Sequence, residues 1–419
     1  MQATGEHHEH GGADLRVLFV DDEPRVLAAL QRMLQGKRPA WTLRFAAGGA
    51  QALDLLADQP VDVVVSDLRM PGMDGAELLA AVREGYPHVV RVVLSAHTER
   101  EATLRALPVA HRFLNKPCDA DTLAEAIARA ATVPRLLRHP EARDYVGSVA
   151  SLPSAPTIWT ALSKRLSDPA VSVNEVAGIV GSDVAMSAKL LQLVNSSFVG
   201  LARQLTSIRE AVIYLGLPML RSLVLSVEAF RAFAGVERAS GLSVDRLCAH
   251  GVTCAGLAAE LVSDPAQRDD AFTAALLADV GQLVLTTCVP TGFGQALARA
   301  AQGELALHAA ELELFGVHHG DVGAYLLSVW GLPTSVVDAV ACHHDPVGPP
   351  AGDVPVTQAV RLAHLLVGRQ AEQPPGAAGK AGQATDELSA WLDAFGERLS
   401  AWLPAAAPGS RASTAILES

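Results

Sequence analysis

Side chains that can handle a phosphoryl group follow four short apolar runs within residues 17–116. They are the adjacent carboxylates of Asp21 and Asp22, the carboxylate of Asp67, the hydroxyl of Ser95 and the ammonium of Lys116. Two or three carboxylates at one place make an oxygen-rich site for a hard divalent cation, and Mg2+ is the first choice. A cation and an ammonium neutralise an incoming phosphoryl group, and an ionised carboxylate can attack it to form an acyl phosphate. The set predicts a magnesium-assisted phosphoryl acceptor with Asp67 as the nucleophile.

The apolar runs predict the sheet that brings these side chains together. A run rich in valine, such as residues 61–65, is typical of a buried central strand of a parallel sheet. Amphipathic stretches separate the runs, at residues 25–34, 49–56, 76–84 and 122–130. This alternation predicts β–α–β units with right-handed crossovers. Because sites in such sheets lie at the carboxyl ends of the strands, we expect the four groups to meet at one edge.

The order of acid pair, acceptor aspartate, hydroxyl and Lys-Pro makes residues 14–135 resemble a response-regulator receiver domain. The resemblance implies a doubly wound α/β domain of the flavodoxin-like class. It also implies that Asp67 accepts phosphate from a sensor histidine kinase or a phosphotransfer protein. A flavodoxin-like domain with incidental acids is the alternative, and it is disfavoured because buried acids without partners are costly.

The same resemblance assigns a role to each residue around the acceptor. The magnesium ligands would be Asp22 and Asp67 directly, Asp21 mainly through water, and the backbone carbonyl oxygen of Arg69. Ser95 and Lys116 would read the phosphorylated state, and Phe113 holds the aromatic switch position. Phosphorylation would shift the face that contains these residues and the predicted helix at 122–130. That shift would change either receiver homodimerisation or the contact between the two domains.

Composition limits the classes of partner. The net charge is −12 and most of the acidic excess follows residue 140, which argues against a nucleic-acid backbone as the main partner. The apolar stretches at 212–230 and 271–289 contain charged residues, so they read as buried helices rather than membrane spans. The five cysteines form no C-x-x-C pair and no secretory signal is visible. We therefore expect a cytoplasmic protein with no membrane partner.

Changes in composition and in hydrophobic periodicity along the chain predict the domain limits. They are a disordered His-rich tail at 1–13, the receiver at 14–135, a linker at 136–147, a helical domain at 148–370, and a low-complexity linker with a possible helix and a disordered tail at 371–419. Residues 148–370 contain helical periodicity and no convincing strand, so we expect this domain to be all-α.

Several stretches of the helical domain resemble the HDOD family, a degenerate relative of the HD metal-dependent phosphohydrolases. Among them are SDVAMSAKLLQLVNSSF at 182–198, LLADVGQLVL at 276–285 and FGVHHGDVGAYLLSVWGLP at 315–333. HDOD domains are helical signal-output modules that follow receivers in bacterial proteins. The resemblance implies that phosphorylation controls a non-catalytic domain that binds a downstream signalling protein.

Whether the helical domain is an enzyme depends on the metal ligands of the HD pattern. The His-Asp pair of that pattern reads Ala278-Asp279 here, so one imidazole ligand is missing. The candidates for a residual HD site are His250, Asp279, His319, His343, His344 and His364. We expect no hydrolase activity. Core, capping or surface roles are more common than metal ligation for histidines in such positions, and a structural role for Asp279 is as compatible with the sequence as ligation. The alternative function is a receiver-controlled, HD-type phosphodiesterase, or a non-hydrolytic nucleotide sensor, that acts on cyclic dinucleotides.

Overall fold

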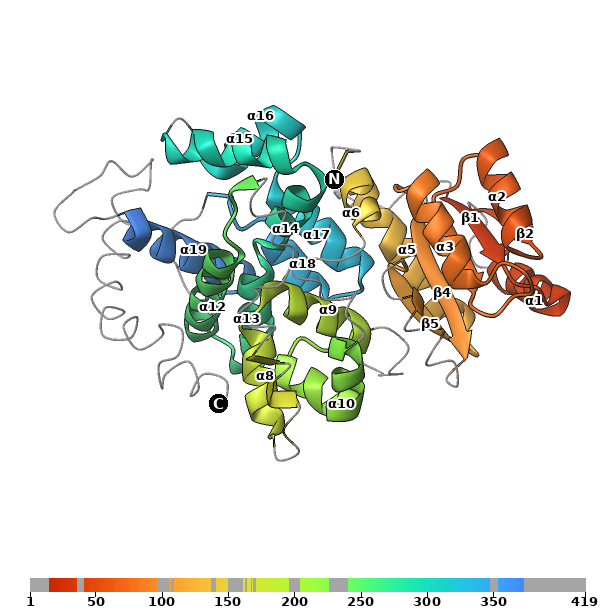
Figure 1. Cartoon of the computed structure of the whole chain (residues 1–419), viewed down its shortest axis with the longest axis horizontal. Helices are drawn as coiled ribbons and strands as arrows, with labels where there is room; N and C mark the ends of the chain where they lie inside the picture. The colour runs from red at the N-terminus through yellow and green to blue at the C-terminus, as the bar shows by residue number, and fades with distance from the viewer. Residues whose placement is uncertain are drawn as a thin grey trace, which may run out of the picture.

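The chain forms an α/β domain followed by a larger helical domain, and the two are joined through helix α6 (Figure 1). The computed structural model describes residues 15–35, 41–96, 102, 105–106, 109–136, 141–149, 161–162, 164–166, 168, 171–195, 204–225, 240–303, 305–346 and 353–372. The expected N-terminal tail at 1–13 and residues 373–419 lie outside the described residues.

The first domain is a five-stranded parallel sheet with the strand order β2-β1-β3-β4-β5. Its strands are β1 (Leu15–Val20), β2 (Trp41–Ala46), β3 (Val63–Asp67), β4 (Val90–Ala96) and β5 (Arg112–Lys116). Its helices are α1 (Pro24–Gln35), α2 (Gly49–Asp58), α3 (Gly75–Gly85) and α5 (Ala120–Leu136). Every residue of the central strand β3 is buried, as its valine-rich run predicts. The doubly wound fold expected from the sequence is confirmed.

Register places the functional residues at one edge of this sheet. Asp67 at the end of β3 is paired with Leu94 of β4, and Ser95 in turn is paired with Asn115 of β5. Helix α3 begins after Asp74, whose side chain accepts a hydrogen bond from the backbone of Glu77 in a capping box. The carboxyl ends of β1, β3, β4 and β5 therefore lie side by side, where the sequence predicts the phosphoryl acceptor.

The second domain is all-helical in the part of it that the structure describes, as expected. Its helices are α8 (Val173–Gly181), α9 (Val184–Asn195), α10 (Ile208–Leu225), α12 (Val244–Leu261), α13 (Arg268–Leu277), α14 (Val280–Cys288), α15 (Pro290–Ala301), α16 (Leu307–Phe315), α17 (His319–Val329), α18 (Thr334–Ala341) and α19 (Val356–Glu372). Helix α10 is kinked at Gly216, where φ is 73°, a conformation that glycine adopts readily.

One helical stretch, Pro265–Cys288, has the length and hydropathy of a membrane span. Within its most apolar window, 83% of the residues are buried inside the molecule. Helices α13 and α14 contribute this stretch, and they pack against α12 and α17 respectively. The stretch is thus core packing of the helical domain, which is how the sequence was interpreted.

The segment expected to be a linker contains helix α6 (Glu141–Ser148). Val146 of α6 is buried, and Gly147 packs so closely that an added Cβ would lie 1.6 Å from the carbonyl oxygen of Pro87. Helix α6 also contacts α14 and α17 of the helical domain. It therefore packs between the two domains (Figure 1).

Candidate functional site

Lys116 joins two carboxylates at the carboxyl edge of the sheet. Its Nζ donates hydrogen bonds to Asp67 Oδ1 at 2.6 Å and to Asp21 Oδ2 at 2.7 Å. Asp67 ends β3, Asp21 follows β1, and Lys116 ends β5, so three separate strands supply the set. Burial lowers the pKa of Lys116, but the hydrogen bonds to Asp21 and Asp67 outweigh burial and raise it above its usual value.

Backbone groups hold the two carboxylates in place. The backbone N–H of Arg69 donates to Asp67 Oδ2 at 3.2 Å, and the backbone N–H of Glu23 donates to Asp21 Oδ1 at 2.9 Å. Gly75 at the start of α3 lies directly on this strand end, because a Cβ there would be 2.0 Å from the carbonyl oxygen of Asp67. The orientation of both acids is therefore set by the main chain as well as by Lys116.

The remaining predicted receiver residues lie around this contact. Ser95 and Phe113 are buried on the neighbouring strands β4 and β5, and Asp22 is partly exposed beside Asp21. Asp67 and Asp21 are buried, whereas the side chain of Lys116 is 30% exposed. The arrangement is a largely buried pair of acids with one ammonium between them and the partly exposed Asp22 beside them.

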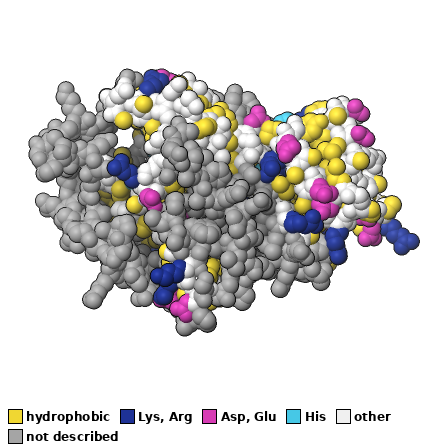
Figure 2. Space-filling view, viewed as in Figure 1, with side chains coloured by type: hydrophobic (Ala, Val, Ile, Leu, Met, Phe, Trp, Pro, Cys, Tyr) yellow, Lys and Arg dark blue, Asp and Glu magenta, His cyan; other side chains and the backbone are white. Residues whose placement is uncertain are grey.

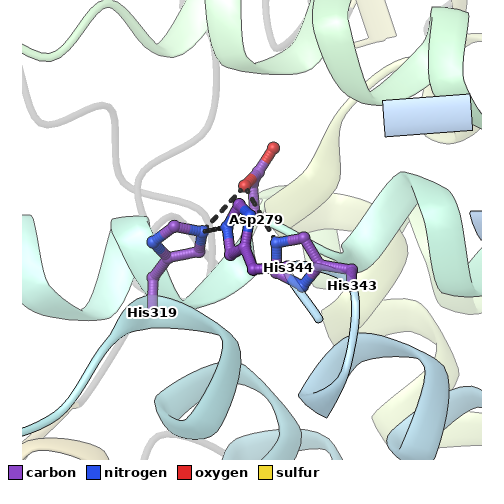
Figure 3. Close-up of side chains that lie close together, drawn as sticks. All are labelled: Asp279, His319, His343 and His344. Carbon is purple, nitrogen blue, oxygen red and sulfur yellow. Dashed lines mark hydrogen bonds and ion pairs between the residues drawn. The ribbon is translucent and has the colours of Figure 1, made fainter. Parts of the chain in front are cut away.

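A second cluster lies in the helical domain and combines one carboxylate with three imidazoles (Figure 3). Asp279 directly precedes α14, where its side chain makes no capping hydrogen bond; His319 is the first residue of α17, and His343 and His344 follow α18. Asp279 Oδ1 lies 3.2 Å from His319 Nε2 and 3.8 Å from His343 Nε2. His344 Nε2 lies 2.7 Å from His319 Nε2. We call these four residues the histidine cluster.

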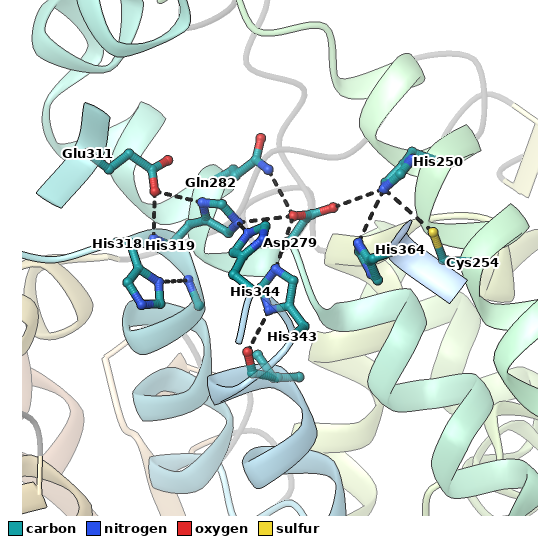
Figure 4. Close-up of polar contacts among 12 residues, drawn as sticks. His250, Cys254, Asp279, Gln282, Glu311, His318, His319, His343, His344 and His364 are labelled. Carbon is teal, nitrogen blue, oxygen red and sulfur yellow. Dashed lines mark hydrogen bonds and ion pairs between the residues drawn. The ribbon is translucent and has the colours of Figure 1, made fainter. Parts of the chain in front are cut away.

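A smaller group adjoins the histidine cluster through the other oxygen of Asp279 (Figure 4). His250 Nε2 lies 3.7 Å from Asp279 Oδ2, 3.4 Å from His364 Nδ1 and 3.5 Å from Cys254 Sγ. His250 and Cys254 are one turn apart on α12, and His364 comes from α19. The structure thus brings together all six residues proposed for a residual HD site.

Hydrogen-bond partners orient the imidazoles from behind. Glu311 Oε2 lies 2.6 Å from His319 Nδ1 and accepts a 2.8 Å hydrogen bond from the His319 backbone N–H. His343 Nδ1 lies 2.7 Å from the carbonyl oxygen of Val340. Gln282 Nε2 donates to Asp279 Oδ1 at 2.9 Å. The contacts of Nδ1 in His319 and His343 leave the Nε2 atom of both rings facing Asp279.

Electrostatics within the cluster are strongly perturbed. Burial lowers the pKa of His319, but Glu311 and Asp279 outweigh burial and raise it to about 10. Burial, with neighbouring His343 and His250, lowers the pKa of His364 to about 3 although Asp279 opposes this. Burial and the adjacent His319 and His343 also hold the pKa of His344 far below its usual value. The pKa of His319, next to Asp279, is thus shifted in the opposite direction from those of His344 and His364.

Comparison with known families separates the two halves of the chain. Residues 17–128 match the response regulator receiver domain family, and residues 152–346 match the HDOD domain family. The chain is a receiver–HDOD response regulator. Both parts were expected from the sequence, and the observed folds agree with them.

Three similar proteins illustrate the range of relatives of this response regulator. An uncharacterized protein of Treponema pallidum is 26% identical over 216 residues, which cover 52% of this chain and 42% of the relative. The hydrogenase transcriptional regulatory protein HoxA of Cupriavidus necator is 38% identical over 116 residues, covering 27% of this chain and 23% of HoxA. The chain spans less than half the length of these curated relatives. The crystal structure of the MmoQ response regulator from Methylococcus capsulatus is 25% identical, covers 58% of this chain and 98% of MmoQ, and gives a TM-score of 0.46.

Two contributors to the histidine groups escaped prediction from the sequence. Cys254 lies four residues after His250, a helical spacing that could have revealed it. Glu311 approaches His319 across the turn between α16 and α17, and no sequence spacing indicates that contact. The receiver–HDOD response regulator therefore has more potential ligands in its output domain than the HD pattern alone suggests.

The two domains of this response regulator meet around a buried arginine of β4. Arg91 Nη2 donates to the carbonyl oxygen of Gly147 in α6 at 2.8 Å, and the side chain also contacts His111. From the HDOD domain, Gln192 Nε2 of α9 donates to the carbonyl oxygens of Ala110 and His111 at 3.4 and 3.3 Å. Helix α17 contacts both α5 and α6. The HDOD domain therefore forms hydrogen bonds with the residues that directly precede β5, and Lys116 lies at the other end of this strand.

Proposed function

We propose that Asp67 is the phosphoacceptor of a phosphorelay and that its phosphorylation controls the HDOD domain through the interdomain contacts. The observation that supports this most strongly is the double hydrogen bond of Lys116 to Asp67 and Asp21. An ammonium held between two acids can neutralise the charge of an arriving phosphoryl group without a large rearrangement.

The transfer step uses groups of this chain that are already in position. An oxygen of the Asp67 carboxylate attacks the phosphorus of a phosphohistidine donor. The new O–P bond forms as the P–N bond breaks, and the bonding electron pair stays on the imidazole nitrogen. Lys116 stays beside the acceptor, and the Arg69 N–H keeps one carboxylate oxygen oriented.

Carboxylate and carbonyl oxygens at the sheet edge suit Mg2+ better than a softer metal. Asp21 and Asp67 already share one cationic group, so their oxygens lie close enough to share a metal ion as well. The proposed ligands are Asp21, Asp22, Asp67 and the backbone carbonyl oxygen of Arg69. Bound Mg2+ would supply charge neutralisation for the transferred phosphoryl oxygens.

The output is proposed to be a change of protein contacts rather than a reaction. Phosphorylation alters the partners of Lys116 and Ser95 at the ends of β5 and β4, and Phe113 is buried in β5, where it is paired with Val93 of β4. The opposite end of β5 is held by Gln192 of the HDOD domain. Movement of β4 or β5 would therefore alter the contacts that the receiver makes with α6 and α9. This change would expose or hide a protein-binding surface, or favour or disfavour a receiver homodimer.

The proposed partners are a sensor histidine kinase or phosphotransfer protein upstream and a signalling protein downstream, in the cytoplasm. On the face shown in Figure 2, basic and acidic side chains are interspersed over the described receiver surface. With a net charge of −12, this supports protein partners over a nucleic-acid backbone. Ala278, buried where the HD pattern has histidine, supports a non-catalytic HDOD domain.

The proposal is tested by phosphorylation of the full chain with acetyl phosphate and Mg2+. Intact-mass analysis should show one phosphoryl group on the parent and none on Asp67→Asn. Asp58→Asn, which changes an exposed carboxylate of the receiver, should behave like the parent. Phosphorylation should then change the assembly seen by sedimentation, or loosen α6 as seen by hydrogen exchange, in the parent and in Asp58→Asn but not in Asp67→Asn. Phosphorylation without either change would contradict the switch.

The gathering of the six HD-type residues favours one alternative output, metal-dependent hydrolysis of a cyclic dinucleotide. Incubation of the full chain with cyclic-di-GMP and Mn2+ tests it. Turnover that disappears in His343→Ala would replace the non-catalytic proposal, and binding without turnover would indicate a nucleotide sensor.

A further inference from the structure

Three ring nitrogens and one carboxylate oxygen of the histidine cluster lie within 4.8 Å of one another inside the HDOD domain (Figure 3). We propose that Asp279, His319, His343 and His344 bind one divalent transition-metal ion, with Zn2+ as the best match, in a closed structural site. This goes beyond the receiver function, and it differs from a hydrolytic centre because all four ligands come from the protein.

The position of the hydrogen atom on His343 supports a cation. Its Nδ1 faces the carbonyl oxygen of Val340, which can only accept, so Nδ1 carries the hydrogen. The Nε2 of the neutral ring then presents a lone pair. This atom is buried and has no hydrogen-bond partner among the described residues. Its nearest charged neighbour is another acceptor, Asp279 Oδ1, at 3.8 Å. Two acceptors that face each other in a buried site are stabilised by a cation between them.

His319 repeats the same arrangement. Its Nδ1 donates to the carboxylate of Glu311, so in the neutral ring Nε2 is an acceptor. That atom lies 3.2 Å from Asp279 Oδ1 and 2.7 Å from His344 Nε2. One metal ion would convert all of these facing lone pairs into ligands. The competing possibility is a second proton on His319, shared with Asp279.

Distances among the ligand atoms fit a tetrahedral ion. With metal–ligand bonds of about 2.1 Å, the edges of a tetrahedron are about 3.4 Å long. The contacts within the cluster run from 2.7 to 3.8 Å, and all four ligand atoms lie within 4.8 Å of one another. Binding therefore needs only shifts of side chains, without movement of the helices.

The surroundings of the cluster are those of a metal site. Histidine ligands of metals commonly donate their second N–H to a carboxylate or a backbone carbonyl, as His319 does to Glu311 and His343 does to Val340. Gly281 allows α14 to approach α17, because a Cβ there would lie 1.9 Å from the carbonyl oxygen of His319. Imidazole-rich sites with one carboxylate suit Zn2+ over Mg2+ or Ca2+.

The test uses the full chain in a background that lacks His7, His8 and His10, each replaced by alanine, because that tract can bind metals on its own. After chelation, the protein is titrated with Zn2+ and with Co2+ and dialysed, and bound metal is measured by mass spectrometry. We expect one tightly held ion per chain and an intense visible Co2+ spectrum typical of tetrahedral coordination.

Variants of the ligands decide the assignment. Asp279→Asn and His343→Gln should each weaken binding at least tenfold, while His88→Gln, an exposed histidine of the receiver, should not change it. Unchanged phosphorylation at Asp67 and an unchanged circular-dichroism spectrum would show that the variants remain folded. The proposal is overturned if no ion is retained, if the ligand variants bind as the background does, or if nitrogen NMR shows His319 doubly protonated in excess Zn2+. A weak, six-coordinate Co2+ spectrum would overturn the closed site.

Discussion

Arg91 of the receiver donates a 2.8 Å hydrogen bond to the carbonyl oxygen of Gly147, a residue of the helix that leads into the HDOD domain. The same guanidinium also donates to the carbonyl oxygens of Val109, Pro87 and Val89. Since these partners come from both sides of the domain boundary, Arg91 couples the position of α6 to the strand that carries Ser95. The boundary is therefore a packed interface and not a free tether.

Gly147→Ala should loosen this interface. The new methyl group would lie 1.6 Å from the carbonyl oxygen of Pro87, so α6 must move away and the bond from Arg91 weakens. Overpacking of this kind costs about 1–3 kcal/mol. Denaturant unfolding should show the loss. Gly85→Ala is the control, because a Cβ there meets nothing within 4 Å. Equal midpoints for the two variants would show that α6 is not held here.

Lys189→Met should stabilise the protein most at low pH. Burial lowers the pKa of Lys189 to about 7, so its folded-state pKa is below its unfolded-state pKa. The unfolded chain then binds more protons between these two values, and stability rises with pH across that window. Replacing a buried charged group with an apolar one of similar volume can add about 1–4 kcal/mol. We expect the larger gain at pH 6 and a smaller one at pH 9.

The control for this pH dependence is Lys164→Met, because Lys164 is exposed in the same domain. It should give the same small effect at both pH values. A gain from Lys189→Met that does not vary with pH would mean that folding does not shift the pKa of Lys189, so that the lysine stays charged in the folded protein.

Lys116→Met should destabilise the receiver in the absence of divalent cations. Without the ammonium, Asp21 and Asp67 keep their negative charges close together, and a buried acceptor without its donor costs about 1–3 kcal/mol. Added Mg2+ should restore more stability to this variant than to the parent, because a cation then replaces the lost charge. Thermal unfolding with and without Mg2+ measures both effects. An equal Mg2+ shift in the two proteins would contradict a shared acidic site.

Glu311→Gln should weaken Zn2+ binding to the histidine cluster without removing a ligand. Glu311 accepts from His319 Nδ1, and partners of this kind contribute about 10–100-fold in metal affinity. Glu313→Gln changes an exposed carboxylate on the same helix and should leave the affinity as it is. Competition titration with a chromophoric chelator measures the difference. Equal affinities would place Glu311 outside the metal site.

Most of the receiver could be predicted from the sequence. Strands β1, β3 and β4 are buried, so each appears as an apolar run, and the polar residue at or just after its end marks the functional edge. The half-buried strand β2, which contains Thr42 and Arg44, has no such run and was not predicted. Asp67, Asp21 and Lys116 lie far apart in the sequence, yet parallel pairing forces their strand ends together. Periodicity and a topological rule were sufficient there.

The HDOD site was only partly predictable, because helix packing is not encoded by any single spacing. The HD pattern indicated His319 and Asp279, but their contact depends on Gly281 allowing α14 and α17 to approach closely. Glu311, whose carboxylate accepts a hydrogen bond from His319, comes from a third helix, α16. The packing of α6 was missed for a similar reason, since a short helix with few apolar residues resembles a linker until its partners are known.

Helix α17 has His319 at its first residue and packs against α5 and α6. Its 11 residues span about 16 Å, so a single rigid segment reaches from the histidine cluster to the receiver. If a metal ion fixes one end of this helix and phosphate displaces its neighbours, the two ligands share one equilibrium. Thermodynamic reciprocity then requires that whatever factor phosphate imposes on metal affinity, the metal imposes on the phosphorylation equilibrium. Such a regulator would respond jointly to a kinase and to the metal content of its surroundings.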